Sequence, residues 1–461
     1  MSSGMRGGRV TRRRFIQTAA IGLGALTGGT LLNACASASH ATTQSLAAAA
    51  GVAPTSKPFA GTTIRVSMFD TAFPRGLQRL LPEFTDLTGI KVDFDLLGFT
   101  VFLQRADLDL SGATGAVDAM TLVFAQSGRW LGAGWAEDLT LFIRSSRFEI
   151  DDLLPGPLAA MKHGDKIYGI PWLADSQLML YRRDLIGRPP DTFDELLETA
   201  KRVHSPAVAG YMPAGKVGLN WVFPTFLYGF GGRFFANPPV DLRPGLATPE
   251  AIRAAEYWAG DLIRNYGAPG STNFEDAEGI ATMQQGRVAI WIHSLGQLTA
   301  ALDPQKSTVA DRVAFAPPPR GPAGRFPQVA SHGLMIPVAS KKKEAAWEFI
   351  KWATSRETMR RVALESQHAA VTRASVLNDP DFKKKYQLGM SDVPALHKAA
   401  LRAAGAGYMA YRTVPVFPAV TERVVIALSA LAAGQKSARE AMTTANGEVI
   451  QILEKAGHRV R

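Results

Sequence analysis

The chain of 461 residues contains a single cysteine, Cys35. One thiol cannot form a disulfide within the chain, so stability must come from the burial of apolar surface. A chain of this length can bury most of that surface, and two or more domains are expected at this size.

Acidic residues are missing from residues 1–34, where five arginines precede an apolar run. An arginine-rich terminus can be a disordered arm for nucleic acid, but the order of basic, apolar and small residues is more typical of an export signal. Glycines and threonines make the run only mildly apolar, whereas a spanning helix needs about 20 predominantly apolar residues. Without these arginines the formal charge falls from +11 to +6.

The segment TRRRFIQ, which contains Arg12 and Arg13, resembles a twin-arginine signal peptide, and LNAC at residues 32–35 resembles the lipobox of bacterial lipoproteins. The resemblance implies cleavage before Cys35 and acylation of its thiol. We therefore expect a signal peptide over residues 1–34, and the lipidated cysteine with a flexible tether over residues 35–60. The mature protein would be extracytoplasmic and lipid-anchored to the bacterial cell membrane, in the periplasm or at the outer face of the cytoplasmic membrane.

The rest of the chain lacks several patterns that carry chemistry. The lysine triplets at 341–343 and 383–385 are isolated, so no nucleic-acid partner is predicted. The eight histidines show no zinc spacing and no G-x-S-x-G motif is present, so we predict no metal and no cofactor. The run from Asp107 to Asp118 imitates a calcium loop, but two internal leucines and the final aspartate disfavour calcium.

Strand and helix periodicities alternate from residue 61 onward. Residues 63–69 alternate as a strand, 77–87 follow helical spacing, and two further strands are predicted at 92–96 and 117–124. This order predicts an α/β fold with a parallel sheet. A second block begins near residue 166, with two short strands at 167–172 and 177–181. The capping-box pattern from Thr192 to Glu195 predicts the start of a helix. Two long helices are predicted at 420–433 and 438–456.

Four segments in order resemble the carbohydrate-binding family of extracytoplasmic solute-binding proteins of ABC importers, the family of maltose-binding protein. They are DKIYGIP with LYRRDL (165–171 and 180–185), GRVAI (286–290), GLMI with KKEAAWEFI (333–336 and 342–350), and residues 118–139 with Gly134, Asp138 and Leu139. The resemblance covers most of the chain from residue 61.

The resemblance implies an α/β, two-lobed periplasmic-binding-protein-like fold of type II, with the ligand in a cleft between lobes and a hinge where the chain crosses. It places residues 61–173 and 326–372 in lobe 1, and residues 174–325 and 373–461 in lobe 2. It implies a monomer that binds a carbohydrate and docks on the transmembrane subunits of an ABC permease.

A sugar presents hydroxyls and an apolar C–H face, so its site needs aromatic rings and planar polar groups near the ends of strands and the crossings. The residues expected to bind ligand on these grounds are Asp70, Phe73, Gln126, Trp130, Trp172, Asp175, Asn220, Trp221, Gly231, Gly232, His293, Ser294, His332 and Arg373. Structural roles compete with this interpretation: Asp70 could cap a helix, Asp175 could hold the hinge, and the glycine pair could form a turn.

Three functions remain open at this point. The first is a lipid-anchored receptor for a sugar or polyol that serves an ABC importer, without enzymatic activity. The second keeps that role for a glycerol-phosphate-type or other anionic solute, which Arg129, Arg183, Arg233 and Arg373 could contact. The third, more remote, is a secreted carbohydrate-active enzyme, because no spacing of acidic residues excludes a glycosidase pair.

Overall fold

The computed structural model describes residues 57–366, 368–388 and 390–460. The predicted signal peptide with Arg12 and Arg13, the predicted lipidation site Cys35, and most of the expected tether lie outside the described residues.

A mixed sheet forms the centre of the described chain, in the order β10-β6-β11-β3-β1-β2, with β9 also paired to β6. The strand β1 (Thr63–Phe69) pairs in parallel with β2 (Lys91–Leu97) and β3 (Ala119–Leu122). The remaining pairs, which involve β6 (Ile170–Arg182), β9 (Ile290–Ser294), β10 (Val313–Ala316) and β11 (Val329–Met335), are antiparallel. The predicted α/β class and its parallel first strands are confirmed.

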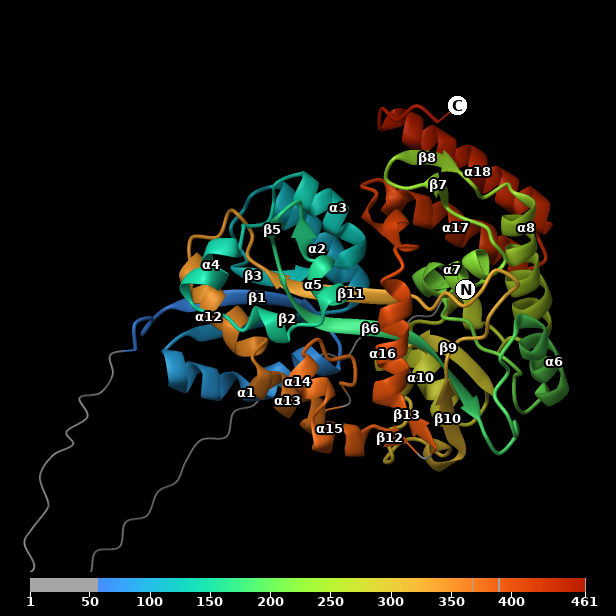
Figure 1. Cartoon of the computed structure of the whole chain (residues 1–461), viewed down its shortest axis with the longest axis horizontal. Coiled ribbons are helices and arrows are strands. Elements are labelled where there is room, and N and C mark those ends of the chain that lie inside the picture. The colour runs from blue at the N-terminus through green and yellow to red at the C-terminus, as the bar shows by residue number, and fades with distance from the viewer. Residues whose placement is uncertain (1–56, 367, 389, 461) are drawn as a thin grey trace, which may run out of the picture. The chain divides into compact units, whose positions relative to one another are not determined.

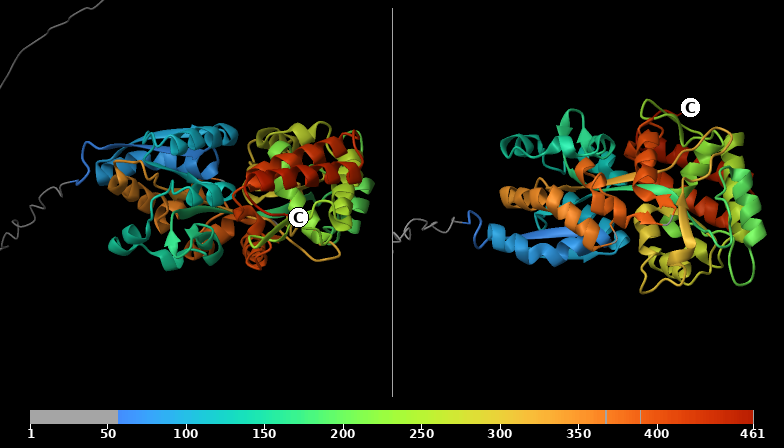
Figure 2. Two further views of the ribbon diagram at one scale, coloured as in Figure 1. Left: turned by 90° about the horizontal axis from the view of Figure 1, so that it is seen from above. Right: turned by 60° about the horizontal axis from the view of Figure 1, so that its bottom comes forward.

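The long strand β6 joins the two halves of this sheet. Its first part pairs with β11 as far as Ser176, and its second part pairs with β9 and β10 from Gln177 onward. Figure 1 shows β6 and β11 crossing between two groups of helices, and the views of Figure 2 show the same two groups of helices from other sides. The prediction of two short strands here was wrong, because Asp175 and Ser176 between them are themselves paired with β11 and each part finds its own partner strand.

Helices cover both parts of the sheet (Figure 1). Around β1, β2 and β3 lie α1 (Ala72–Thr88), α2 (Phe99–Ser111), α3 (Phe124–Gly132), α4 (Thr140–Ser145), α5 (Pro155–Ala159), α12 (Lys343–Ala353), α13 (Arg356–Glu365), α14 (Ala374–Leu377) and α15 (Pro380–Lys385). The other group contains α6 (Phe193–Val203), α7 (Leu219–Gly229), α8 (Pro249–Ala255), α9 (Arg264–Tyr266), α10 (Asp276–Gln284), α11 (Leu295–Ala300), α17 (Phe417–Ala432) and α18 (Ala438–Lys455). The helix α16 (Val393–Ala404) packs on β6 and β11.

Three two-stranded ribbons complete the strands: β4 (Lys162–His163) with β5 (Lys166–Ile167), β7 (Phe235–Asn237) with β8 (Asp241–Pro244), and β12 (Gln387–Leu388) with β13 (Ser391–Asp392).

Local sequence signals explain several helix ends. The predicted capping box at the start of α6 is confirmed, because Thr192 accepts from the backbone of Glu195 while the Glu195 side chain accepts from that of Thr192. Gly89 ends α1 in the left-handed conformation that glycine adopts without strain. The last two helices also lie where the sequence predicts them, within a few residues.

None of the helices in the described ranges has the length and apolar character needed to cross a membrane. The described residues also contain no group of three or more His, Cys, Asp or Glu side chains that could hold a metal ion. Asp107, at the start of the calcium-like run, lies on α2 and pairs with Arg129.

Candidate ligand-binding site

Aromatic side chains gather where β1 ends, beside β6 and β11. The rings of Phe73 and Trp172 stack with centroids 5.1 Å apart. Phe69 lies 5.5 Å from Trp172 and 5.2 Å from His332. We call Phe69, Phe73, Trp172 and His332 the aromatic group. Its members come from three separate segments of the chain, so the fold creates an apolar wall that no local motif contains.

His332 presents a neutral acceptor within this wall. Its Nδ1 accepts a hydrogen bond of 3.3 Å from the backbone N–H of Phe124, the first residue of α3. Desolvation, followed by the nearby charge of Arg412, lowers the pKa of His332 to about 3. The imidazole is therefore uncharged at neutral pH, and the side chain of Arg412 lies close enough for its charge to act on it.

A second group of polar and aromatic side chains lies around the start of α7. Asn220 donates through Nδ2 to Thr421 of α17 over 3.1 Å, and Gln177 of β6 donates to the Trp221 carbonyl over 3.4 Å. The guanidinium of Arg412 lies 5.1 Å from the centroid of the Trp221 ring, a cation–π contact. We call Gln177, Asn220, Trp221 and Arg412 the polar group.

Arg412 differs from the other buried arginines of the described ranges. Arg182 forms an ion pair with Asp184, and Arg373 forms one with Asp152. Arg412 is 5% exposed, and its hydrogen-bond partners are neutral: it donates to the Tyr411 hydroxyl over 3.0 Å and to Gln328 Oε1 over 3.4 Å. A buried cation without a carboxylate is costly unless other electron-rich groups solvate it.

The middle of β6 carries a buried carboxylate. Asp175 Oδ1 accepts from the backbone N–H of Gly296 over 3.1 Å, and the side chain of Ser294 also donates to this carboxylate. Desolvation outweighs these hydrogen bonds and raises the pKa of Asp175 to about 6. Asp175 therefore connects the crossing strand to Ser294 and to the segment that follows β9.

Several buried polar atoms in these groups lack a hydrogen-bond partner. They are Nε1 of Trp172, Nε1 of Trp221 and Oδ1 of Asn220. The hydroxyl of Thr71, between Phe69 and Phe73 in the sequence, is also buried and unpaired. Native structures rarely leave buried polar atoms unpaired. Outside the two groups, Thr121 Oγ1, Trp291 Nε1, His368 Nε2 and His397 Nε2 are unpaired as well.

Of the residues predicted to bind ligand, Phe73, Trp172 and His332 lie in the aromatic group, Asn220 and Trp221 lie in the polar group, and Asp175 and Ser294 contact each other. His293 lies beside Ser294, and its Nε2 is 3.4 Å from Asp276. Their ligand contacts stay predictions.

The other predicted residues have partners or positions of their own. Asp70 forms an ion pair with Arg75, and Gln126 accepts from Arg129 over 3.4 Å. Trp130 is fully buried and donates to Asp107 over 2.8 Å. Gly231 and Gly232 form the turn after α7, where Gly231 has a φ of +91°.

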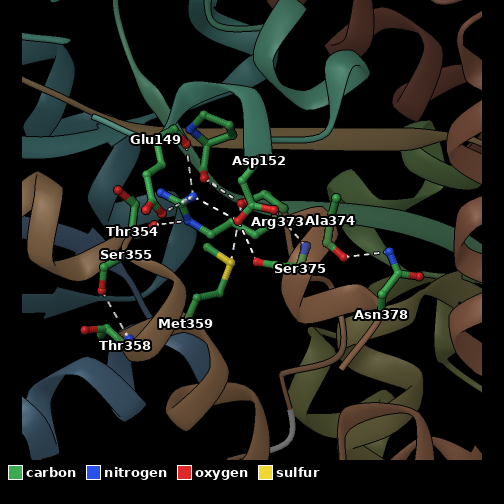
Figure 3. Close-up of polar contacts among 12 residues, drawn as sticks. Glu149, Asp152, Thr354, Ser355, Thr358, Met359, Arg373, Ala374, Ser375 and Asn378 are labelled. Carbon is green, nitrogen blue, oxygen red and sulfur yellow. Dashed lines mark hydrogen bonds and ion pairs between the residues drawn. The ribbon is translucent and has the colours of Figure 1, made fainter. Parts of the chain in front are cut away.

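Arg373 occupies a structural junction that Figure 3 shows in detail. Its Nε donates to the Thr354 carbonyl over 2.6 Å, and its Nη1 donates to Asp152 and to the Glu149 carbonyl over 3.1 Å each. Because three segments of the chain use its donors, we leave Arg373 out of the proposed site.

Sequence reasoning missed Arg412, Gln177, Gln328 and Thr71. Gln177 and Thr71 stand next to predicted site residues, so a wider window after each strand would have included them. Arg412 follows Tyr408 and Tyr411, but it lies beyond every predicted strand end and crossing, and its other neighbours Gln328 and Trp221 come from distant segments.

The comparisons with known proteins agree with this arrangement. The sequence profile described as bacterial extracellular solute-binding protein matches residues 71–360. A mannitol-binding protein of Pseudomonas aeruginosa is 27% identical, over 83% of this chain and 91% of that protein.

Solved structures share the fold. A solute-binding protein of Agrobacterium vitis S4 with bound D-mannitol has a TM-score of 0.76 and 27% identity, over 86% of this chain and 99% of that chain. One of Agrobacterium radiobacter K84 in complex with ribitol has a TM-score of 0.78 and 21% identity, over 86% of this chain and all of that one. The two-lobed fold of solute-binding proteins, expected from the sequence, is thereby confirmed.

Proposed function

Because the chain belongs to the family of bacterial extracellular solute-binding proteins, we propose that it captures a sugar or polyol outside the cytoplasm and delivers it to the permease of an ABC importer. The relatives that support this ligand class are the mannitol-binding protein and the structure with bound D-mannitol. Members of this family bind solutes, and we propose that this chain releases its ligand unchanged.

The unpaired polar atoms of the aromatic and polar groups carry the proposal. A polyol has an apolar C–H surface that packs on aromatic rings, and hydroxyls that both donate and accept. Nε1 of Trp172 and Trp221 can donate to such hydroxyls, and Oδ1 of Asn220 can accept from them. Arg412 offers a planar fork of donors to adjacent hydroxyls.

Isothermal titration of the purified protein with D-mannitol, ribitol and maltose tests the proposal. We expect saturable binding of one equivalent of at least one of these ligands. Trp172→Phe and Trp221→Phe should weaken that binding, because each keeps an aromatic face but loses its indole N–H. Trp352→Phe is the matched control, since its ring packs against Phe84 and Phe349, which belong to neither group. No binding of any sugar or polyol, or equal affinity in all variants, would refute the proposal.

A second ligand class, a sugar acid or other anionic polyol, is favoured by the unpaired charge of Arg412. The arginines first considered for this role have other environments: Arg129 pairs with Asp107, Arg373 with Asp152, Arg183 donates to the Asp311 carbonyl, and Arg233 is exposed. Titration with D-mannonate beside D-mannitol separates the two classes, because the pair differs only in one terminal carboxylate. Tighter binding of the acid would support the anionic class.

The anchor and the lobe limits complete the proposal. We propose that a lipid on Cys35 holds the protein at the membrane as a monomer, near the permease. We place residues 61–173 and 326–372 in lobe 1 and residues 174–325 in lobe 2, because β6 changes partners at Ser176–Gln177 and β11 begins at Val329. The sequence expectation puts residues 373–461 in lobe 2 as well, but α14 and α15 pack on α13, so we place the last crossing after Lys385.

A further inference from the structure

The helix α3 meets a short turn near the end of the chain with almost no space between them. The turn is the 3-10 segment Ala410–Thr413, which precedes α17. A Cβ atom on Gly128 would collide with the Thr413 carbonyl oxygen, and would lie 3.0 Å from its carbon and 3.6 Å from Pro415 N. The absence of a side chain at Gly128 therefore permits this contact.

The two sides of the contact are anchored to different parts of the fold. On one side, Trp130 of α3 is fully buried and donates to Asp107 of α2, so α3 is fixed on the part of the fold that contains β1 and β3. On the other side, Tyr411 lies 4.7 Å from Phe234 and 4.9 Å from Phe417. The contact thus bridges the two proposed lobes.

No hydrogen bond or ion pair joins residues 124–132 to residues 405–416, both of which the structure describes throughout. The close approach of Gly321 to Gly229 is different, because Ala323 N donates to the Gly229 carbonyl over 2.8 Å beside it. A contact that rests on van der Waals packing alone separates without breaking a hydrogen bond. Its composition suits a surface that opens and closes.

Both sides of the contact continue directly into the candidate site. The backbone N–H of Phe124, which begins α3, donates to His332 of the aromatic group. Arg412 of the polar group immediately precedes Thr413, whose carbonyl faces Gly128. A solute that contacts Arg412 and the aromatic group would draw these two segments together.

We propose that Gly128 is a positioning residue for ligand capture, because it allows α3 to close on the Ala410–Thr413 turn when the solute binds between the lobes. The inference rests on the proposed function and adds a determinant of affinity that does not touch the ligand. A side chain at this position holds the lobes apart in the liganded state and leaves the open, ligand-free state unaffected.

The test compares Gly128→Ala with Gly132→Ala. Both glycines lie on α3, but a Cβ at Gly132 meets nothing within 4 Å. Alanine is the better helix former, so neither change should lower the melting temperature of the ligand-free protein. For D-mannitol, ribitol or maltose, whichever the wild type binds, Gly128→Ala should raise the Kd roughly 5- to 100-fold through faster dissociation, by the steric cost of an overpacked contact. Gly128→Val should raise it further, and Gly132→Ala should leave it unchanged.

Equal affinity of the two alanine variants would overturn the inference and leave the proposed function intact. A fall in the ligand-free melting temperature of Gly128→Ala that matches its loss of affinity would also overturn it, because the contact would then be permanent packing. If the wild type binds no member of the panel, the proposed function fails and this inference fails with it.

Discussion

At the scale of single residues, the contrast between Arg373 and Arg412 separates structure from function. Both guanidiniums are buried, at 1% and 5% exposure. Arg373 has the carboxylate of Asp152, whose pKa stays below its usual range because hydrogen bonds from Ser375 and Arg373 outweigh desolvation. Arg412 has only neutral partners. Arg373 is thus part of an ion pair within the fold, whereas the charge of Arg412 is available to a ligand.

Replacement of Arg412 by glutamine should therefore weaken binding without weakening the fold. Hydrogen bonds to a charged group are worth about 1.5–3 kcal/mol, so the Kd should rise roughly 10- to 100-fold. The free energy of unfolding without ligand should stay the same or rise, because an unpaired buried charge is removed. Arg373→Gln is the matched control and should lower the unfolding free energy by about 3–5 kcal/mol. Titration calorimetry measures the Kd of both variants, and urea unfolding measures their stability. A destabilised Arg412→Gln protein with unchanged ligand affinity would contradict the prediction.

The buried carboxylate of Asp175 predicts a pH dependence of stability. Burial raises its pKa to about 6. An unfolded aspartate has a pKa near 3.9, so the folded protein retains a proton that the unfolded chain releases between about pH 4 and 6. As pH rises through that window, Asp175 lowers the free energy of unfolding, by roughly 3 kcal/mol in full.

Asp175→Asn should remove this contribution. The measurement is urea unfolding of wild type and variant at pH 4.5 and at pH 7.5. From the lower to the higher pH, the free energy of unfolding should fall more for the wild type than for the variant. Burial also lowers the pKa values of His368 and His397, to about 3 and about 4. Their contribution to the pH dependence of stability is the same in wild type and variant, so the comparison removes it. An equal difference at both pH values would show that Asp175 titrates normally.

Particular residues show how far sequence reasoning reaches. Trp172 and Asp175 lie on the crossing strand β6, and Asn220 and Trp221 lie at the start of α7, which Gln177 of β6 contacts through the Trp221 carbonyl. Arg373 satisfied the same criterion, but its partner Asp152 is 221 positions away and no local pattern announces that ion pair. The environment of Arg412 is likewise made by distant segments. Local pattern thus locates the region of the site, while charge compensation depends on tertiary contacts.

At the scale of elements, β6 is the part of the fold that sequence periodicity described least well. All its residues are buried, so apolar and polar residues do not alternate along it. Periodicity therefore predicts two short strands in place of one long strand. The hydrogen bond of 2.7 Å between Ser176 and His397 links its midpoint to α16. The helix α6 is the opposite case, because its capping box is entirely local and was recognised from sequence.

The capping box of α6 gives a prediction for this scale. Thr192→Ala removes the acceptor for the Glu195 N–H, which now lies 3.2 Å from Thr192 Oγ1. The free energy of unfolding should fall by about 1 kcal/mol, as for other lost N-caps. Thr100→Ala, at an exposed position of α2, serves as the control. Chemical denaturation measures both, and equal stability of the two variants would show that the box does not stabilise the fold.

At the scale of the whole molecule, the function depends on export as well as on binding. The proposed twin-arginine signal and lipid site predict that Arg12→Lys with Arg13→Lys blocks export, and that Cys35→Ala releases an otherwise folded protein from the membrane. Cell fractionation of both variants, with radiolabelled fatty acid to follow the lipid, measures these outcomes. Normal export of the double-lysine variant would contradict the signal, and a membrane-bound Cys35→Ala protein would contradict the anchor.

The central claim is that the unpaired atoms of the aromatic and polar groups mark the ligand site. A crystal structure of the protein grown with D-mannitol, or with whichever sugar or polyol binds most tightly in titration, tests it most directly. We predict density for the ligand within hydrogen-bond distance of Trp172 Nε1, Trp221 Nε1 and Arg412, with a C–H face against the aromatic group. Ligand bound elsewhere, with these atoms still unpaired or paired only with one another, would contradict the account.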